Sequence, residues 1–109
     1  MRHYEAMIVL RSGATPEKMQ ESIQKAEEVI KKNGGLIQEE IKWGKRNLAY
    51  AIKKKREGYY LLVYFQAEPS SIKPITEAYR LLDEDVLRAM ILERGDGEPV
   101  KSVQAHEAR

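Results

Sequence analysis

Cysteine is absent from this chain of 109 residues, and histidine occurs only twice. The lack of cysteine excludes a disulfide framework, a thiol nucleophile and a thiolate metal site, and it favours a cytosolic location. His3 and His106 lie near opposite ends of the sequence, so neither has the neighbours that a metal site or an activated nucleophile requires. We therefore expect neither a metal ion nor an organic cofactor.

The carboxylates and glycines add no catalytic pattern. Acidic residues adjoin at Glu27-Glu28, Glu39-Glu40 and residues 83–85, which is typical of solvent-exposed helix, strand and turn positions. Gly34-Gly35 and residues 95–97 lack the strand-to-helix context of a phosphate-binding loop. We expect that the protein is not an enzyme.

Long hydrophobic runs are also missing. The longest apolar stretch spans residues 59–65, which is far short of the roughly 20 residues that a membrane-spanning helix needs. Met1 and Arg2 lead directly into an alternating pattern, without a secretory hydrophobic segment. A length of 109 residues suits one domain with a modest core, so we expect one domain without targeting or membrane segments to carry the function.

The sequence does contain one strongly basic segment, residues 42–56. It holds seven basic and no acidic residues, whereas the rest of the chain holds twelve basic and seventeen acidic ones, so the net charge of +2 is a +7 segment on a −5 body. This separation predicts a local anion-binding face, most simply for nucleic-acid phosphates. A lysine-rich hairpin that protects an edge strand from aggregation would have the same composition. The basic residues are Lys42, Lys45, Arg46, Lys53, Lys54, Lys55 and Arg56.

The first two elements have clear sequence signals. Residues 2–10 alternate with the period of a strand, and both faces are partly apolar, which is typical of a central strand. Thr15 as N-cap and Pro16 at the first helical position predict a helix start, and residues 33–35 (Asn-Gly-Gly) predict its left-handed stop. Apolar residues recur between these signals at helical spacing, namely Met19, Ile23, Ala26, Val29 and Ile30.

The basic segment overlaps the next predicted strand. Residues 36–43 and 48–52 both alternate, but their apolar positions are shifted by one register. Such a shift requires a bulge or bend, and Gly44 lies where this distortion costs least. We expect the distortion to direct Lys45 and Arg46 outward.

The remaining chain completes the pattern. Residues 53–58 predict a long basic hairpin loop, and the continuous apolar sequence of residues 59–67 predicts a third strand in the middle of the sheet. Residues 68–71 predict a helix start with a serine cap, and residues 86–92 a last strand. From residue 94 the periodicity is lost, so residues 94–109 are expected to form a flexible tail.

The order strand, helix, strand, strand, helix, strand predicts an α+β domain over residues 1–93. Right-handed crossovers produce the ferredoxin-like split βαβ fold, a four-stranded antiparallel sheet with strands one and three in the centre and two helices on one face. If residues 4, 6, 8 and 10 face the helices, the opposite face is apolar and suits a protein partner. The expected partner surface consists of Met7, Val9, Tyr60, Leu62 and Tyr64.

Three stretches resemble one known family: residues 1–5 (MRHYE), residues 44–52 (GKRNLAYAI) and Gly58-Tyr59-Tyr60 after the lysine cluster. They are similar to protein number six of the bacterial small ribosomal subunit, with the resemblance extending over residues 1–92. It implies a structural, cytoplasmic ribosomal protein that binds the central domain of small-subunit ribosomal RNA together with small-subunit ribosomal protein number eighteen. The resemblance and the charge pattern together give the expected RNA-binding residues as Arg2, Lys45, Arg46, Lys53, Lys54, Lys55 and Arg56.

Other functions of the same fold stay open at this point. An RRM outside the ribosome would carry stacking aromatics on its third strand, but Tyr60 stands at a small-residue position of that pattern and Leu61 at the central aromatic one. A small acyl phosphate hydrolase would need a phosphate-cradling loop after the first strand, where residues 11–14 are short and poor in spaced glycines. A ligand-sensing regulatory module is the remaining alternative.

Overall fold

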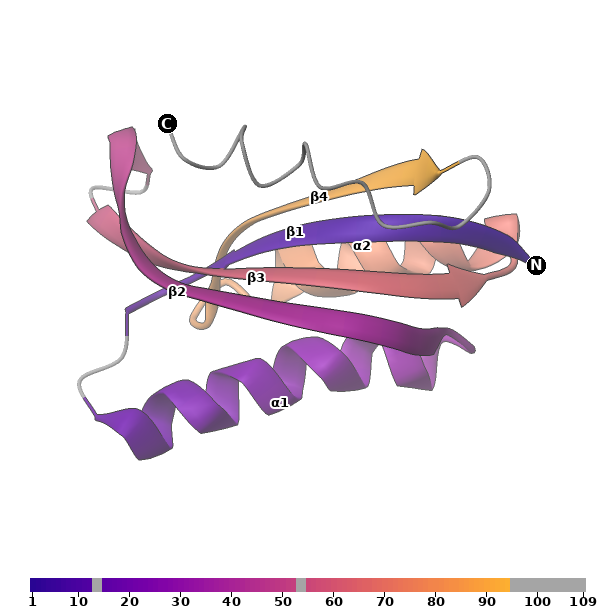
Figure 1. Ribbon diagram of the computed structural model, residues 1–109, viewed down its shortest axis with the longest axis horizontal. Coiled ribbons are helices and arrows are strands. Elements are labelled where there is room, and N and C mark those ends of the chain that lie inside the picture. The colour runs from indigo at the N-terminus through magenta and orange to yellow at the C-terminus, as the bar shows by residue number, and fades with distance from the viewer. Residues whose placement is uncertain (13–14, 53–54, 95–109) are drawn as a thin grey trace.

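The structure, a computed structural model, describes residues 1–12, 15–52 and 55–94, with only the backbone at residues 48–52 and 55–56. Its elements follow the predicted order (Figure 1). They are β1 (Arg2–Leu10), α1 (Pro16–Lys32), β2 (Leu36–Ile52), β3 (Lys55–Ala67), a 3-10 turn (Pro69–Ser71), α2 (Ile72–Leu81) and β4 (Val86–Arg94).

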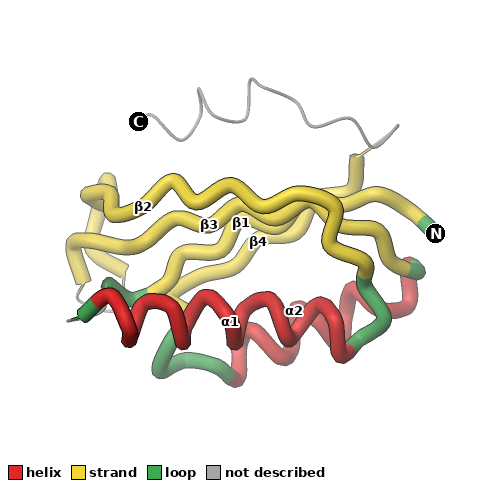
Figure 2. Tube along the Cα trace, turned by 60° about the horizontal axis from the view of Figure 1, so that its bottom comes forward, coloured by secondary structure: helices red, strands yellow, loops and turns green. Residues whose placement is uncertain are grey.

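The four strands form one antiparallel sheet in the order β2-β3-β1-β4. Both helices cover the same face of this sheet (Figure 2). The ferredoxin-like fold and the central positions of β1 and β3 are thus confirmed. No helix in the described ranges is long and apolar enough to cross a membrane.

The main core lies between the sheet and the helices. Alternate residues of β1 and β3 form the sheet side of this core, where the rings of Tyr4 and Phe65 stack with centroids 5.6 Å apart. The predicted apolar stripe of α1 packs against this side of the sheet. Tyr79 of α2 is buried, and its hydroxyl donates to the backbone carbonyl of Ala26 at 2.8 Å, which satisfies a polar group inside the core.

The helix ends show which local signals hold. Thr15 caps α1 as predicted, because its side chain accepts a hydrogen bond from the Lys18 amide at 3.1 Å, and Gly34 has the left-handed φ of 85° after the last turn. The predicted serine cap of α2 is wrong. Ser71 makes no side-chain cap bond, because the chain enters through a 3-10 turn in which its amide donates to the Glu68 carbonyl at 2.8 Å.

Three register shifts interrupt the pairing of β2 with β3, and one of them lies between Asn47 and Ile52. The one predicted near Gly44 is confirmed by a register shift and a φ of 85° at this glycine. A second shift, between Ile37 and Glu39, was not predicted. Ile37 and Ile41 are four residues apart and would share a face in a regular strand. Because of the second shift, Ile37 packs on the helix side of the sheet, whereas Ile41 pairs with Leu62 on the other face.

The predicted hairpin loop at residues 53–58 is wrong in its extent. β2 continues to Ile52 and β3 begins at Lys55, so strand pairing occupies much of that stretch. β1 ends at Leu10, opposite Tyr59, and β2 and β3 have only each other as partners beyond that point. Residues 45–58 are here named the basic ribbon, and its described residues, 45–52 and 55–58, therefore project past the sheet as two paired strands (Figure 1).

The sheet face opposite the helices differs from the expectation in its exposure. The predicted phase is right, but Val9, Leu62 and Tyr64 are buried, and Met7 and Tyr60 are half-buried. Long side chains of the edge strand explain part of this burial, since the Arg94 guanidinium lies 5.2 Å from the centre of the Tyr64 ring. Arg94 itself was expected in the tail, yet it ends β4, while residues 95–109 lie outside the described part.

Candidate nucleic-acid interface

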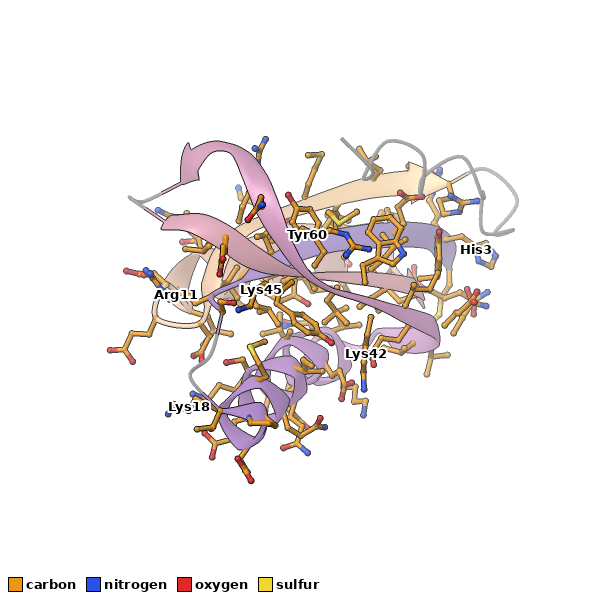
Figure 3. The ribbon with its side chains drawn as sticks, turned by 60° about the vertical axis from the view of Figure 1, so that its left-hand side comes forward. His3, Arg11, Lys18, Lys42, Lys45 and Tyr60 are labelled. Atoms are coloured by element: carbon orange, nitrogen blue, oxygen red, sulfur yellow. The ribbon has the colours of Figure 1, made fainter. Side chains whose placement is uncertain are left out.

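Lys45 and Arg46 begin the basic ribbon and lie on opposite faces of it. Lys45 pairs with Tyr59 on the helix side of the sheet, and Arg46 pairs with Gly58 on the other side. Figure 3 shows Lys45 on the helix side and Tyr60 on the far side. Both side chains are exposed, in agreement with the expected outward direction. They lie on opposite faces because the strand alternates normally after Gly44.

The two side chains also differ in their partners. The Lys45 Nζ lies 3.5 Å from a carboxylate oxygen of Glu57, which is on the same face of the ribbon. Both groups are exposed, so this pair adds little stability and exchanges readily for another anion. Among the described residues, the Arg46 guanidinium reaches only the backbone carbonyl of Lys45, at 3.4 Å. Arg46 is therefore the more available cation.

The other predicted contacts of the ribbon are only partly described. Lys53 and Lys54 lie outside the described residues, while Lys55 and Arg56 belong to the backbone of β3. By sequence, the basic ribbon holds six basic residues and one acidic residue, Glu57. Its charge of +5, counted from the sequence, thus belongs to a hairpin whose described residues pair with no third strand.

Arg2 does not join this group. It pairs with Ala67, eight residues along β3 from Tyr59, which corresponds to about 27 Å at the usual rise per residue. Glu93 also binds its guanidinium at 2.6 Å, and this hydrogen bond and charge raise the pKa of Arg2. The structure therefore separates the RNA-binding residues expected from sequence into the basic ribbon and an isolated, ion-paired arginine at the opposite end of the sheet.

Two carboxylates expected in solvent meet instead between α1 and β2. Glu40 lies on the helix-facing side of β2 and contacts Glu27 of α1. Desolvation first, and then the hydrogen bond and charge of Glu27, raise the pKa of Glu40 to about 7. The unpredicted bulge after Ile37 is what turns Glu40 inward, so the sequence pattern carried no signal for this pair.

Asp85 is a third carboxylate with a structural contact. It accepts hydrogen bonds from the Ser22 hydroxyl at 2.9 Å and from Lys25 at 3.2 Å, which ties the turn before β4 to α1. Within the described ranges, no cluster of three or more histidine or acidic side chains could hold a metal ion. These three carboxylates make contacts within the domain, and the basic ribbon is the main chemical feature of the described surface.

A ferredoxin-like sheet that extends a basic ribbon into solvent has the architecture of a structural protein that assembles with RNA. Residues 3–93 match the family model described as ribosomal protein S6. The chain therefore belongs to the ribosomal protein S6 family, bS6, whose members are proteins of the small ribosomal subunit. This membership confirms the resemblance, the non-enzymatic assignment and a place in the ribosome.

Individual relatives agree with this assignment. The small ribosomal subunit protein bS6 of Helicobacter pylori (strain G27) is 43% identical over 108 residues, which cover 99% of this chain and 73% of the relative. That of Clostridium novyi (strain NT) is 37% identical over 92 residues, covering 84% and 96%. The crystal structure of 30S ribosomal protein S6 from Thermotoga maritima superposes with a TM-score of 0.79 at 25% identity, covering 99% of this chain and 98% of that one.

The geometry also speaks against the RRM alternative. An RRM stacks bases on aromatic side chains that stand exposed on its central strands. Here Tyr64 is only 3% exposed and lies under Arg94, so its ring offers no free face. Tyr64 therefore cannot serve as a stacking platform for single-strand readout, and Tyr60 on the same face is half-buried.

Proposed function

We propose that this chain binds the central domain of small-subunit ribosomal RNA through its basic ribbon, together with small-subunit ribosomal protein number eighteen. The observation that carries the proposal is the projection of the ribbon beyond the sheet with a charge of +5. Cations on a projecting hairpin reach a phosphate backbone without a clash from the rest of the domain. Such contacts supply affinity and orientation more than base specificity.

The opposite orientations of Lys45 and Arg46 favour a particular mode of RNA contact. Because one cation lies on each face of the ribbon, a single flat backbone cannot neutralise both without wrapping around the hairpin. Insertion of the ribbon between two RNA segments satisfies both faces at once. The basic ribbon is therefore suited to a site where two phosphate backbones approach each other.

The protein partner is assigned to the sheet face opposite the helices. Of the five residues expected there, Met7 and Tyr60 keep accessible surface, while Val9, Leu62 and Tyr64 are buried under neighbouring side chains. The edge strand β4 adds Met90 and Leu92, which lie on the same face and are 44% and 52% exposed. These apolar side chains give a partner more surface to bury than the central strands alone.

Binding of the purified chain to a central-domain RNA fragment, with and without protein number eighteen, tests the proposal. If about four ribbon cations each neutralise a phosphate, log affinity falls with log salt at a slope of roughly −3 to −4. The protein partner is expected to strengthen binding at every salt concentration. Equal binding to the central domain and to an unrelated RNA duplex, in the presence of the partner, would contradict the proposal.

A further inference from the structure

Most of the described arginine side chains are already held by the protein. Six arginines have described side chains. Three of them pair with a carboxylate, and Arg11 donates two hydrogen bonds to the backbone carbonyl of Asp83. The four pairs are Arg2 with Glu93, Arg11 with the Asp83 carbonyl, Arg80 with Glu77 and Arg94 with Glu5. The two that remain without a carboxylate partner among the described residues are Arg46 and Arg88.

These two arginines share one face and one end of the sheet. Arg88 lies on β4 opposite Val9, Val9 lies opposite Tyr60, and Tyr60 lies opposite Gly44, so the four residues form one row across the sheet. Arg46 follows Gly44 by two residues and therefore points to the same side. The row spans three strand spacings, or about 14 Å from Gly44 to Arg88.

Two of the three residues between these arginines, Gly44 and Val9, present no exposed side chain. Gly44 has no side chain, and a Cβ placed there would have no neighbour within 4 Å. Val9 is buried, and Tyr60 is half-buried. A strip with a glycine and a buried valine, bordered by exposed guanidinium groups, lets a backbone approach the sheet closely beside the half-buried Tyr60 ring.

From this arrangement we infer that Arg88 is a second phosphate-binding residue, and that the RNA backbone passes from Arg46 over Gly44 and along Tyr60, at the edge of the protein-partner surface, to Arg88. The inference rests on the proposed function, since it extends the contact of the basic ribbon onto the sheet. A guanidinium grips phosphate through two parallel hydrogen bonds, which suits Arg88 to anchor the far end of this path. The contact surface then includes a residue 30 positions beyond the end of the ribbon in sequence.

The test compares Arg88→Ala with Arg80→Ala, a matched control on α2 whose side chain is exposed and paired with Glu77. Binding to the central-domain RNA fragment is measured from low to high salt with protein number eighteen present. Arg88→Ala is expected to reduce the magnitude of the salt slope by about one, Arg88→Lys to restore most of it, and Arg80→Ala to change nothing.

Other outcomes separate this inference from the proposed function. If Arg46→Ala reduces the slope but Arg88→Ala behaves like Arg80→Ala, the ribbon binds RNA and the path across the sheet is wrong. If Arg88→Ala weakens association with protein number eighteen in the absence of RNA and leaves the RNA slope unchanged, Arg88 belongs to the protein interface. If the wild-type chain shows no salt-dependent binding, both the proposed function and the inference fail.

Discussion

Arg94 of β4 forms an ion pair with Glu5 of β1 on the sheet face opposite the helices, and both side chains are only 9% exposed. The same guanidinium covers the ring of Tyr64. This pair joins the edge strand to the centre of the sheet through side chains as well as through the backbone ladder. It also shows that Arg94, which was expected in the tail, packs on the folded domain.

Removal of one partner of this pair is expected to destabilise the domain. Arg94→Ala leaves the Glu5 carboxylate buried without its cation, which costs about 3 kcal/mol of unfolding free energy. Arg80→Ala, which breaks an exposed pair, is expected to cost less than about 0.5 kcal/mol. Urea unfolding measures both. A double replacement of Glu5 and Arg94 by leucine should recover most of the loss, and equal effects of the two alanine variants would contradict a structural role for the pair.

The two cations at the base of the ribbon are expected to respond differently to mutation. Arg46→Ala should reduce the salt slope of RNA binding by about one, and Lys45→Ala by less, because Lys45 must first leave Glu57. In the double variant the magnitude of the salt slope should fall by up to about two, and the thermal stability should stay the same. An unchanged slope in the double variant would mean that the basic segment only protects an edge strand.

Glu57 offers the opposite change. Glu57→Gln removes the anion that competes with phosphate for Lys45, so RNA affinity is expected to rise and the salt slope to steepen by up to about one. Glu21→Gln is the matched control, because Glu21 is an exposed partner of Lys18 on α1. Titrations at several salt concentrations compare the two. A gain of the same size in both variants would indicate a general effect of net charge rather than the release of Lys45.

Stability is expected to depend on pH through Glu40. Its pKa is about 7 in the fold against an ordinary value of 4.5, so the folded state holds a proton that the unfolded state releases. Stability therefore falls as pH rises from about 4.5 to about 7. Glu40→Gln should raise the Tm by about 5 °C at pH 8 and have little effect at pH 4, whereas Glu39→Gln, at an exposed neighbour, should change neither. A Tm gain for Glu40→Gln that is equal at both pH values would rule out this titration.

The apolar face gives a test for the protein partner. Leu92 is 52% exposed, so Leu92→Glu should fold normally and weaken association with protein number eighteen at least tenfold. Leu81→Glu is the control, since Leu81 is 74% exposed on α2 at the other side of the sheet. Leu62 is fully buried, and Leu62→Glu is therefore expected to unfold the domain rather than to act on the interface alone. Equal binding of the Leu92 and Leu81 variants would move the interface elsewhere.

The sequence by itself determined the order of the elements and hence the fold. The signals are local: Thr15 and Pro16 start a helix, Gly34 ends it, and the apolar run in residues 59–67 requires a central strand. Each depends on the conformational preference of a few neighbouring residues, so it holds wherever the segment is placed. The concentration of charge in residues 42–56 is likewise independent of the fold.

Only the tertiary structure decided which side chains meet. No glycine in the sequence indicates the bulge between Ile37 and Glu39. Its one extra residue moves Glu40 to the opposite face of the strand, where it contacts Glu27. Strand pairing separates Arg2 from the ribbon and brings Arg88 into line with Gly44, because neighbours in a sheet depend on strand order and register. The burial of Tyr64 depends in the same way on Arg94, a long side chain from another strand, and nothing in the local sequence of β3 encodes that contact.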